Sequence, residues 1–284
     1  MPRRFPYRWD LNLYRGCAHG CVYCYAQYSH AFLGNGTFAR DIYVKTNVIE
    51  KLEQQLCSRS WTREIINIGG VTDSYQPAEE RFRLMPDVWR LLIRTETPAV
   101  VSTKSDLILR DIDLIEELSR ITYVNVASTV TTLDAGLQKR IEPGTVSPER
   151  RLRMLKAFRK TNASTGLHVM PVIPELTDSL DNLDGLFRRG KDCDVDYLLA
   201  GMLYLRGTTR ELFLEWFLNE DAQRFERFSA LCRPGRRHSQ YREMLYQRIQ
   251  HLRMVHDLRG DYSKAMETRF KQTQDCQLEW FMDV

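Results

Sequence analysis

The sequence contains no apolar run of the length that a transmembrane helix needs, so we expect no membrane span. Its first ten residues, MPRRFPYRWD, are basic but lack the apolar segment of a secretory signal. Neither an internal repeat nor a low-complexity segment is found. These absences predict a globular, cytoplasmic protein, and 284 residues suffice for one large domain or two small ones.

The chain also lacks a strong charge of either sign and an even set of cysteines. A formal net charge of +4 permits an anionic substrate but does not demand nucleic acid. Seven cysteines are an odd number, in a chain too large to need disulfides as staples. With no export signal, this composition indicates reduced thiols in the cytosol.

Short apolar runs alternate with helical patterns through most of the chain. Near-continuous apolar runs are typical of parallel strands that are buried on both faces. A first strand is expected near LNLY, just before the first cysteines, and further strands are expected at 64–70, 99–104, 121–128, 165–174 and 194–204. Repeated strand–helix units, about six by this reading, predict an α/β fold, a partial (β/α)6 barrel of parallel strands.

Helical patterns fill the segments between the strands and take over near the end of the chain. The expected helices are 47–57 with Asn47 as N-cap, one opened by Pro86, one opened by Ser147–Pro148, and 208–231 and 239–258. No strand signal follows residue 205. We therefore expect a barrel core over residues 1–205 and a C-terminal helical extension over 206–284, packed on the core.

Three cysteines lie close together in the segment RGCAHGCVYCY, and no fourth follows nearby. Cys17, Cys21 and Cys24 have the spacing C-x3-C-x2-C. A structural zinc site needs four protein ligands. His19 could be the fourth, but it lies inside the loop, where the geometry is tight. Thiolates also hold iron–sulfur clusters, and three of them on a four-iron cluster leave one iron open. The spacing favours an open cluster over zinc, which stays the alternative; the remaining cysteines, at 57, 193, 232 and 276, are scattered.

The segment GCAHGCVYCYAQ resembles the signature loop of radical S-adenosylmethionine (SAM) enzymes, C-x3-C-x-aromatic-C, with Tyr23 as the aromatic residue. The resemblance implies a [4Fe–4S] cluster whose open iron is chelated by the amino and carboxylate groups of SAM. It further implies one-electron cleavage of the sulfonium to a 5′-deoxyadenosyl radical, which abstracts hydrogen from a substrate. A flavodoxin- or ferredoxin-like protein would supply the electron. The protein itself supplies binding, orientation and protection from solvent.

Four further segments are similar to the spore photoproduct lyase-like branch of these enzymes. They are GGVTDSYQPAEERFRL (69–84), STKSDLILRDIDLI (102–115), RIEPGTVSPERRL (140–152) and MPVIPELTDS (170–179), in the same order. Spore photoproduct lyase carries a cysteine hydrogen donor just ahead of the Thr/Ser–Asp pair, whereas this chain has Gly70–Val71 there. This departure argues against thymine-dimer repair and leaves the substrate open.

Residues after the second strand are expected to contact SAM, because ligands bind at the carboxyl ends of barrel strands. Gly69 and Gly70 would let the backbone approach a ligand closely. Thr72 or Asp73 could accept a hydrogen bond from the methionyl ammonium. A plain turn closed by an Asx bond is the alternative.

Further cofactor contacts are expected at the ends of the later strands. Lys104 could pair with the methionyl carboxylate, since packing poorly explains a lysine at a strand end. Ser128 could bond the same carboxylate or the ribose, or be a satisfied buried hydroxyl. Val172 and Ile173 would form an apolar adenine slot with Tyr23, although they are equally good core residues.

Other polar residues carry weaker hypotheses. Tyr75 and Gln76 could lie at the barrel mouth near a substrate. Arg140 and Glu142 could belong to the site, with a solvated ion pair as the alternative. The basic segment 233–238, CRPGRRH with its cysteine, could meet phosphates, so nucleic acid is a candidate partner. A non-enzymatic iron–sulfur or zinc protein, in the form of a nucleic-acid-binding module, is the competing functional interpretation.

Overall fold

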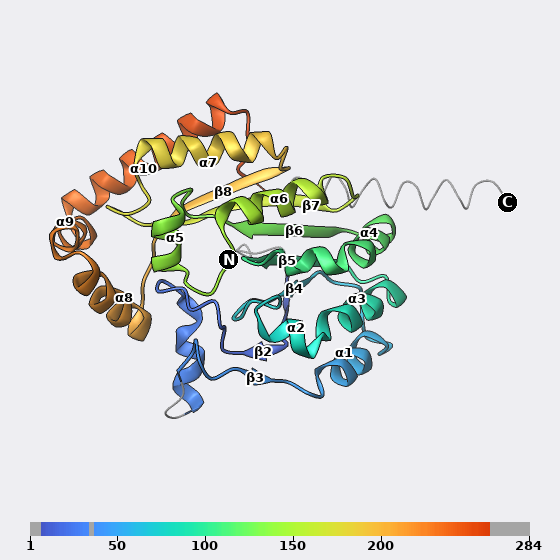
Figure 1. Ribbon diagram of the computed structural model, residues 1–284. Coiled ribbons are helices and arrows are strands. Elements are labelled where there is room, and N and C mark those ends of the chain that lie inside the picture. The colour runs from blue at the N-terminus through green and yellow to red at the C-terminus, as the bar shows by residue number, and fades with distance from the viewer. Residues whose placement is uncertain (1–6, 34–36, 262–284) are drawn as a thin grey trace.

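The computed structural model describes residues 7–33 and 37–261, and within them six parallel strands form one sheet in chain order (Figure 1). These strands are β1 (Trp9–Leu11), β4 (Ile66–Ile68), β5 (Ala99–Thr103), β6 (Val124–Thr129), β7 (Ser164–Val172) and β8 (Tyr197–Met202). Each lies in a segment where the apolar runs predict a strand, except that β1 begins slightly before LNLY. Within the described residues β1 and β8 do not pair, so the sheet is an open, partial barrel and the expected fold class is confirmed.

Helices follow the strands and cover one face of the sheet. They include α1 (Val48–Leu56), α3 (Leu84–Arg94), α4 (Ile112–Ile121), α6 (Pro148–Phe158) and α7 (Leu180–Asp192), with the short α2 (Ala78–Phe82), α5 (Ala135–Ile141) and 3-10 helix η2 (Asp106–Asp111) between. Because crossovers between parallel strands are right-handed, strands in sequential order place these helices on the same side. The main core lies between them and the sheet, with Trp89, Leu92 and Phe158 fully buried.

The expected helix starts are confirmed with two adjustments. Ser147 caps α6, as the Ser147–Pro148 start signal predicts. Its side chain accepts a hydrogen bond from the Arg150 amide. Asn47 precedes α1 but its side chain makes no capping bond. Pro86 is the third residue of α3, which begins at Leu84.

The segment expected as one helix over 208–231 is two helices, which corrects the sequence prediction. α8 (Gly207–Glu220) ends at Asp221, whose extended backbone breaks the helix and whose carboxylate caps α9 (Ala222–Cys232) by accepting from the Arg224 amide. α10 (Arg236–Val255) then begins inside the basic segment 233–238, so this segment is only partly a loop.

The C-terminal helices pack on the barrel rather than standing apart. Phe213, Phe217 and Phe228 share one buried cluster with Cys21 and Tyr23 of the cysteine segment. α8 lies against the 3-10 helix η1 (Tyr25–Leu33), and α10 lies against α7 and β8 (Figure 1). The division at residue 205 stays a prediction, and the end of the expected extension, 262–284, lies outside the described residues.

The structure adds a pair of short strands that the sequence patterns did not predict. β2 (Tyr14–Arg15) and β3 (Tyr43–Val44) form a small antiparallel pair that brackets the cysteine segment and η1. In the described part of the chain, no helix combines the length and apolar character needed to cross a membrane.

A glycine inside the barrel gives a test of the strand packing. A Cβ on Gly166 of β7 would overlap the Tyr197 ring of β8, whereas a Cβ on Gly201 would make an ordinary contact of 3.5 Å with Met170. Forcing extra volume into a packed interior typically costs about 1–3 kcal/mol. We expect Gly166→Ala to lower the free energy of unfolding by about that amount in urea denaturation. Gly201→Ala is the control, with an expected change below about 1 kcal/mol.

Candidate functional site

A cavity of about 430 Å³ opens at the carboxyl ends of the parallel strands, and all three clustered cysteines line it. The rest of its wall comes mainly from the ends of β4, β5, β6, β7 and β8 and from the segment after Cys24. Of the residues predicted as cofactor contacts, it brings together Tyr23, Gly69, Gly70, Thr72, Asp73 and Lys104. The sequence motifs therefore meet at one place although they are far apart in the chain.

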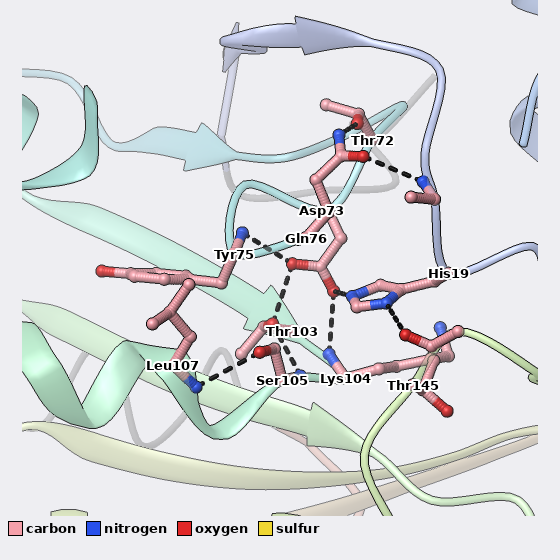
Figure 2. A network of polar contacts seen from close by, with 12 residues as sticks. His19, Thr72, Asp73, Tyr75, Gln76, Thr103, Lys104, Ser105, Leu107 and Thr145 are labelled. Carbon is pink, nitrogen blue, oxygen red and sulfur yellow. Dashed lines mark hydrogen bonds and ion pairs between the residues drawn. The ribbon is translucent and has the colours of Figure 1, made fainter. Parts of the chain in front are cut away.

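The residues after β4 hold the cysteine segment by hydrogen bonds to its backbone. The Thr72 hydroxyl donates to the Gly16 carbonyl oxygen at 2.6 Å. Gln76 donates to the same oxygen at 3.1 Å. It also accepts from the Ala18 amide at 2.9 Å (Figure 2). Gln76 is fully buried, so the expectation that it lies at the barrel mouth is wrong. Its side chain fixes the start of the cysteine loop instead.

Asp73 joins the cysteine segment to the end of β5. Its Oδ2 accepts from the Lys104 amide at 2.8 Å and faces His19 Nε2 at 3.1 Å. Its Oδ1 accepts from the Tyr75 amide and the Thr103 hydroxyl (Figure 2). Burial alone would raise the pKa of this carboxyl, but the facing His19 ring and the N–H donors hold the pKa well below its usual range. Four protein groups thus occupy the acceptor sites of Asp73; direct contact of Thr72 or Asp73 with a cofactor stays a prediction.

The segment after α5 holds the cysteine loop from the opposite side. Gly144 donates its amide to the His19 carbonyl oxygen at 3.0 Å and accepts from His19 Nδ1 at 2.9 Å. A Cβ on Gly144 would overlap the Ala18 carbonyl oxygen, so only glycine permits this approach. Both ring nitrogens of His19 face oxygens. Neither is therefore directed at the cysteines as a fourth ligand.

Glu142 is buried beside this contact, which corrects the expectation of a solvated pair with Arg140. Its carboxylate forms an ion pair with Arg151 at 2.6 Å, and neither side chain is exposed. The Tyr23 hydroxyl, between two of the cysteines, donates to the same carboxylate. Arg140 instead pairs with Glu220 at 2.8 Å on the surface. The Glu142–Arg151 pair therefore fixes the Tyr23 ring in the cavity wall.

The cysteine thiols lie in surroundings that oppose their charged form. Burial raises the pKa of Cys17 to about 12 and raises that of Cys21 and Cys24 as well. Such thiols stay protonated until a metal displaces the proton. Within 7–33 and 37–261, no three His, Cys, Asp or Glu side chains converge tightly enough to hold a single metal ion.

The other cysteines lie away from the cavity, as far as the described residues show. Cys193 is buried and Cys57 is exposed, while Cys232 is partly buried near the aromatic cluster of α8 and α9. Cys276 lies outside the described residues. No fourth cysteine lines the cavity within the part of the chain that the structure covers.

Lys104 brings a positive charge into the cavity. Its ammonium lies 5.8 Å from the centre of the Tyr23 ring, and no described carboxylate forms an ion pair with it. Burial opposes the charged form, but the thiolate form of Cys21 and the Glu142 carboxylate hold the pKa of Lys104 above its usual range. The cation is therefore available to an anionic group of a bound molecule.

The two glycines after β4 shape the adjacent rim. Gly69 has a φ of +89°, and a Cβ there would lie 2.8 Å from the Thr72 carbonyl oxygen. Gly70 accepts a hydrogen bond from the Tyr25 hydroxyl at its carbonyl oxygen. This turn lets the backbone itself form part of the cavity wall.

Three predicted cofactor contacts, and Tyr75, are not brought to the cavity. Ser128 is fully buried and its hydroxyl donates to the Thr103 carbonyl oxygen at 2.7 Å. Val172 is fully buried in the main core. Ile173 is fully buried in the aromatic cluster of α8 and α9. Tyr75 is also fully buried, against Trp89 and Asp111, and not at the barrel mouth.

Several lining residues were missed by the sequence interpretation. The interior of the cavity is formed by Asn67 of β4, Ser102 of β5, Thr129 of β6, and His168 and Met170 of β7, and Tyr25 and Tyr204 are more exposed. A signal for one of them was present, since His168 is the one charged-type residue in the apolar run TGLHVMPVIP. Alternation along β7 would then have added Met170 on the same face.

Comparison with known proteins gives one family and a set of relatives. The model of the radical SAM superfamily matches residues 11–184. An uncharacterized protein of Mycobacterium tuberculosis (strain H37Rv) is 37% identical over 264 residues, which are 92% of this chain and 78% of that protein. An uncharacterized protein of Methanocaldococcus jannaschii is 30% identical over 171 residues, 60% of this chain and 62% of that protein.

Solved structures show a related fold. A spore photoproduct lyase variant with bound AdoMet and dinucleoside spore photoproduct gives a TM-score of 0.57 at 15% identity. The match covers 76% of this chain and 62% of that one, so this chain spans less than two thirds of the lyase. Streptococcus suis SuiB bound to S-adenosylmethionine gives 0.50 at 15% identity, with 77% and 49% covered. The family match over residues 11–184 shows that the chain belongs to the radical SAM superfamily.

Proposed function

We propose that this protein is a radical SAM enzyme in which Cys17, Cys21 and Cys24 hold a [4Fe–4S] cluster beside a SAM site. The observation that carries the proposal is the meeting of these three cysteines and Lys104 in one cavity. A bound cluster would supply the electron that cleaves SAM to a 5′-deoxyadenosyl radical, which abstracts hydrogen from a substrate. The decisive experiment is anaerobic reconstitution followed by an assay for 5′-deoxyadenosine.

The donor set fits an iron–sulfur cluster better than a single ion. Soft thiolates suit iron–sulfur clusters, in which each cysteine binds a different iron, so the three sulfurs need not converge on one point. A single zinc ion needs all its ligands within about 2.3 Å. No such convergence is present among the described residues. An iron–sulfur protein that only carries electrons would need four cysteine ligands, whereas the described cavity wall offers three.

The residues around the cysteines support a defined orientation for SAM. Lys104 provides the cation for the methionyl carboxylate, and the Gly69–Gly70 backbone provides a close wall. The Tyr23 ring, held by Glu142, offers an apolar face beside the cysteines. These side chains bind and orient the cofactor, and the buried wall limits access of water.

The substrate is not a thymine dimer in this proposal. Gly70 and Val71 line the cavity where spore photoproduct lyase has its donor cysteine, and no further described cysteine replaces it. The exposed residues Arg233, Arg236 and Arg237 lie outside the cavity wall. Nucleic acid as a partner, the flavodoxin- or ferredoxin-like reductant and the cytoplasmic location stay predictions.

The first prediction concerns the cluster ligands. Changing Cys17, Cys21 or Cys24 to Ala removes one of three thiolates, so iron bound per chain after reconstitution should fall to near zero. The visible iron–sulfur absorbance and the formation of 5′-deoxyadenosine should be lost with it. Cys57→Ala, Cys193→Ala, Cys232→Ala and Cys276→Ala are the matched controls and should retain both. Loss of iron in one of these four would reveal a fourth protein ligand and count against the proposed open cluster.

The second prediction concerns Lys104. A hydrogen bond to a charged group contributes about 1.5–3 kcal/mol, so Lys104→Ala should weaken SAM binding about tenfold or more. Iron content should not change, because Lys104 is not a ligand. Isothermal titration calorimetry on the reconstituted protein measures the affinity, with Lys51→Ala on the exposed face of α1 as control. An unchanged dissociation constant would remove Lys104 from the SAM site.

A further inference from the structure

The inner end of the cavity is polar, although the sheet around it is packed with apolar side chains. Ser102 of β5 and His168 of β7 line it from different strands, and Asn67 of β4 adds an amide. Below them the Tyr197 ring of β8 occupies the barrel interior, in space that Gly166 leaves free. Gly166 and four polar side chains thus occupy positions at which apolar residues would otherwise fill the barrel. The four side chains are those of Asn67, Ser102, His168 and Tyr197.

A directed chain of hydrogen bonds leads to the His168 ring from the backbone. Asn125 of β6 donates its amide N–H to the Ser164 carbonyl oxygen at 3.3 Å, which orients the side chain. Its Oδ1 accepts from the Tyr197 hydroxyl at 2.9 Å. The phenol has one proton, so its oxygen faces His168 Nε2, 3.3 Å away, as an acceptor. His168 must then carry its proton on Nε2.

This tautomer leaves the Nδ1 atom of His168 as an acceptor. Its one described polar neighbour is the Ser102 hydroxyl, at a long 3.4 Å, and both side chains line the cavity. The ring is also uncharged at neutral pH, because burial and the Lys104 charge lower the pKa of His168 to about 4. A lone pair on a neutral ring repels an anion and favours a donor.

We infer that the inner end of the cavity is a binding subsite in which His168 Nδ1 accepts a hydrogen bond from an uncharged hydroxyl or N–H group of the bound molecule. Tyr197 and Asn125 act as positioning residues through His168. The inference rests on the proposed function, because it concerns the molecule that shares the cavity with the cluster and SAM. The donor would come either from the substrate or from the ribose of SAM.

The tautomer is testable without any ligand. In the full chain labelled with ¹⁵N-histidine, we expect the two-bond ¹H–¹⁵N spectrum at neutral pH to show His168 as a neutral ring protonated on Nε2. Tyr197→Phe removes the acceptor oxygen and should give a mixture of tautomers, whereas Ser102→Ala should leave the pattern unchanged. A His168 protonated on Nδ1, or on both nitrogens, overturns the inference. This result does not depend on cluster assembly, so it is separable from failure of the proposed function.

The donor preference is testable with size-matched probes. Acetamide and phenol carry a donor, and acetone and anisole are their counterparts without one. We expect the donor-bearing member of each pair to shift the His168 Nδ1 signal at lower concentration, by about tenfold, with acetate the weakest. Equal effects within the pairs, a preference for acetate, or no shift with any probe overturns the inference.

Titration of the reconstituted wild type and of His168→Phe with SAM distinguishes the two sources of the donor, the substrate and the ribose of SAM. Unchanged SAM affinity, together with the probe preference, assigns the subsite to the substrate. A loss of about tenfold that is matched by a 2′- or 3′-deoxyribose analogue on the wild type assigns it to the ribose. A loss in His168→Phe that neither analogue reproduces indicates a packing effect and overturns the hydrogen-bond role.

Discussion

The buried contact between Asp73 and His19 is the constraint on which the cavity depends. One carboxylate ties together the turn after β4, the end of β5 and the loop that carries the cysteines. A buried carboxylate that loses a hydrogen-bond partner typically costs about 1–3 kcal/mol or more, because its charge is left without compensation. These contacts hold the loop between Cys17 and Cys21 through groups other than its thiols, and the thiols line one cavity.

A second set of contacts closes the loop from the other side, and it explains why distant segments matter to the site. Gly144 meets the loop backbone where a side chain would collide, and the Glu142–Arg151 pair holds the hydroxyl of Tyr23. The aromatic cluster of α8 and α9 packs behind the same tyrosine. A cysteine loop that is otherwise irregular backbone thus gains support from β4, from the segment after α5 and from the C-terminal helices. Its geometry is a property of the whole chain.

The sequence predicts the features that depend on local pattern, such as the strands and the cysteine segment. It does not predict which side chains at the strand ends face the cavity. Apolar runs locate the strands, and spacing alone singles out the three cysteines. Whether a residue at a strand end faces the cavity is set by the register of the pleat, where a shift of one residue reverses the face. Ser128 is therefore buried away from the cavity, bonded to the Thr103 carbonyl oxygen, while Thr129 lines the cavity. Charge gives no better guide, since RIEPG looks like solvated sequence. Glu142 is nevertheless fully buried against Arg151, nine positions further along the chain.

Lys104 connects the two ends of the cavity electrostatically. Its charge is stabilised by the Glu142 carboxylate, and it forms no ion pair with a described carboxylate, so it favours an anionic group beside the cysteines. The same charge helps to keep His168 neutral, and so favours an uncharged donor at the inner end. One lysine therefore gives the cavity a polarity along its length. A molecule that fits this cavity would carry its negative charge next to the cysteines and its hydroxyl or N–H group toward the strands. The part of the molecule between these two groups would then lie over the barrel.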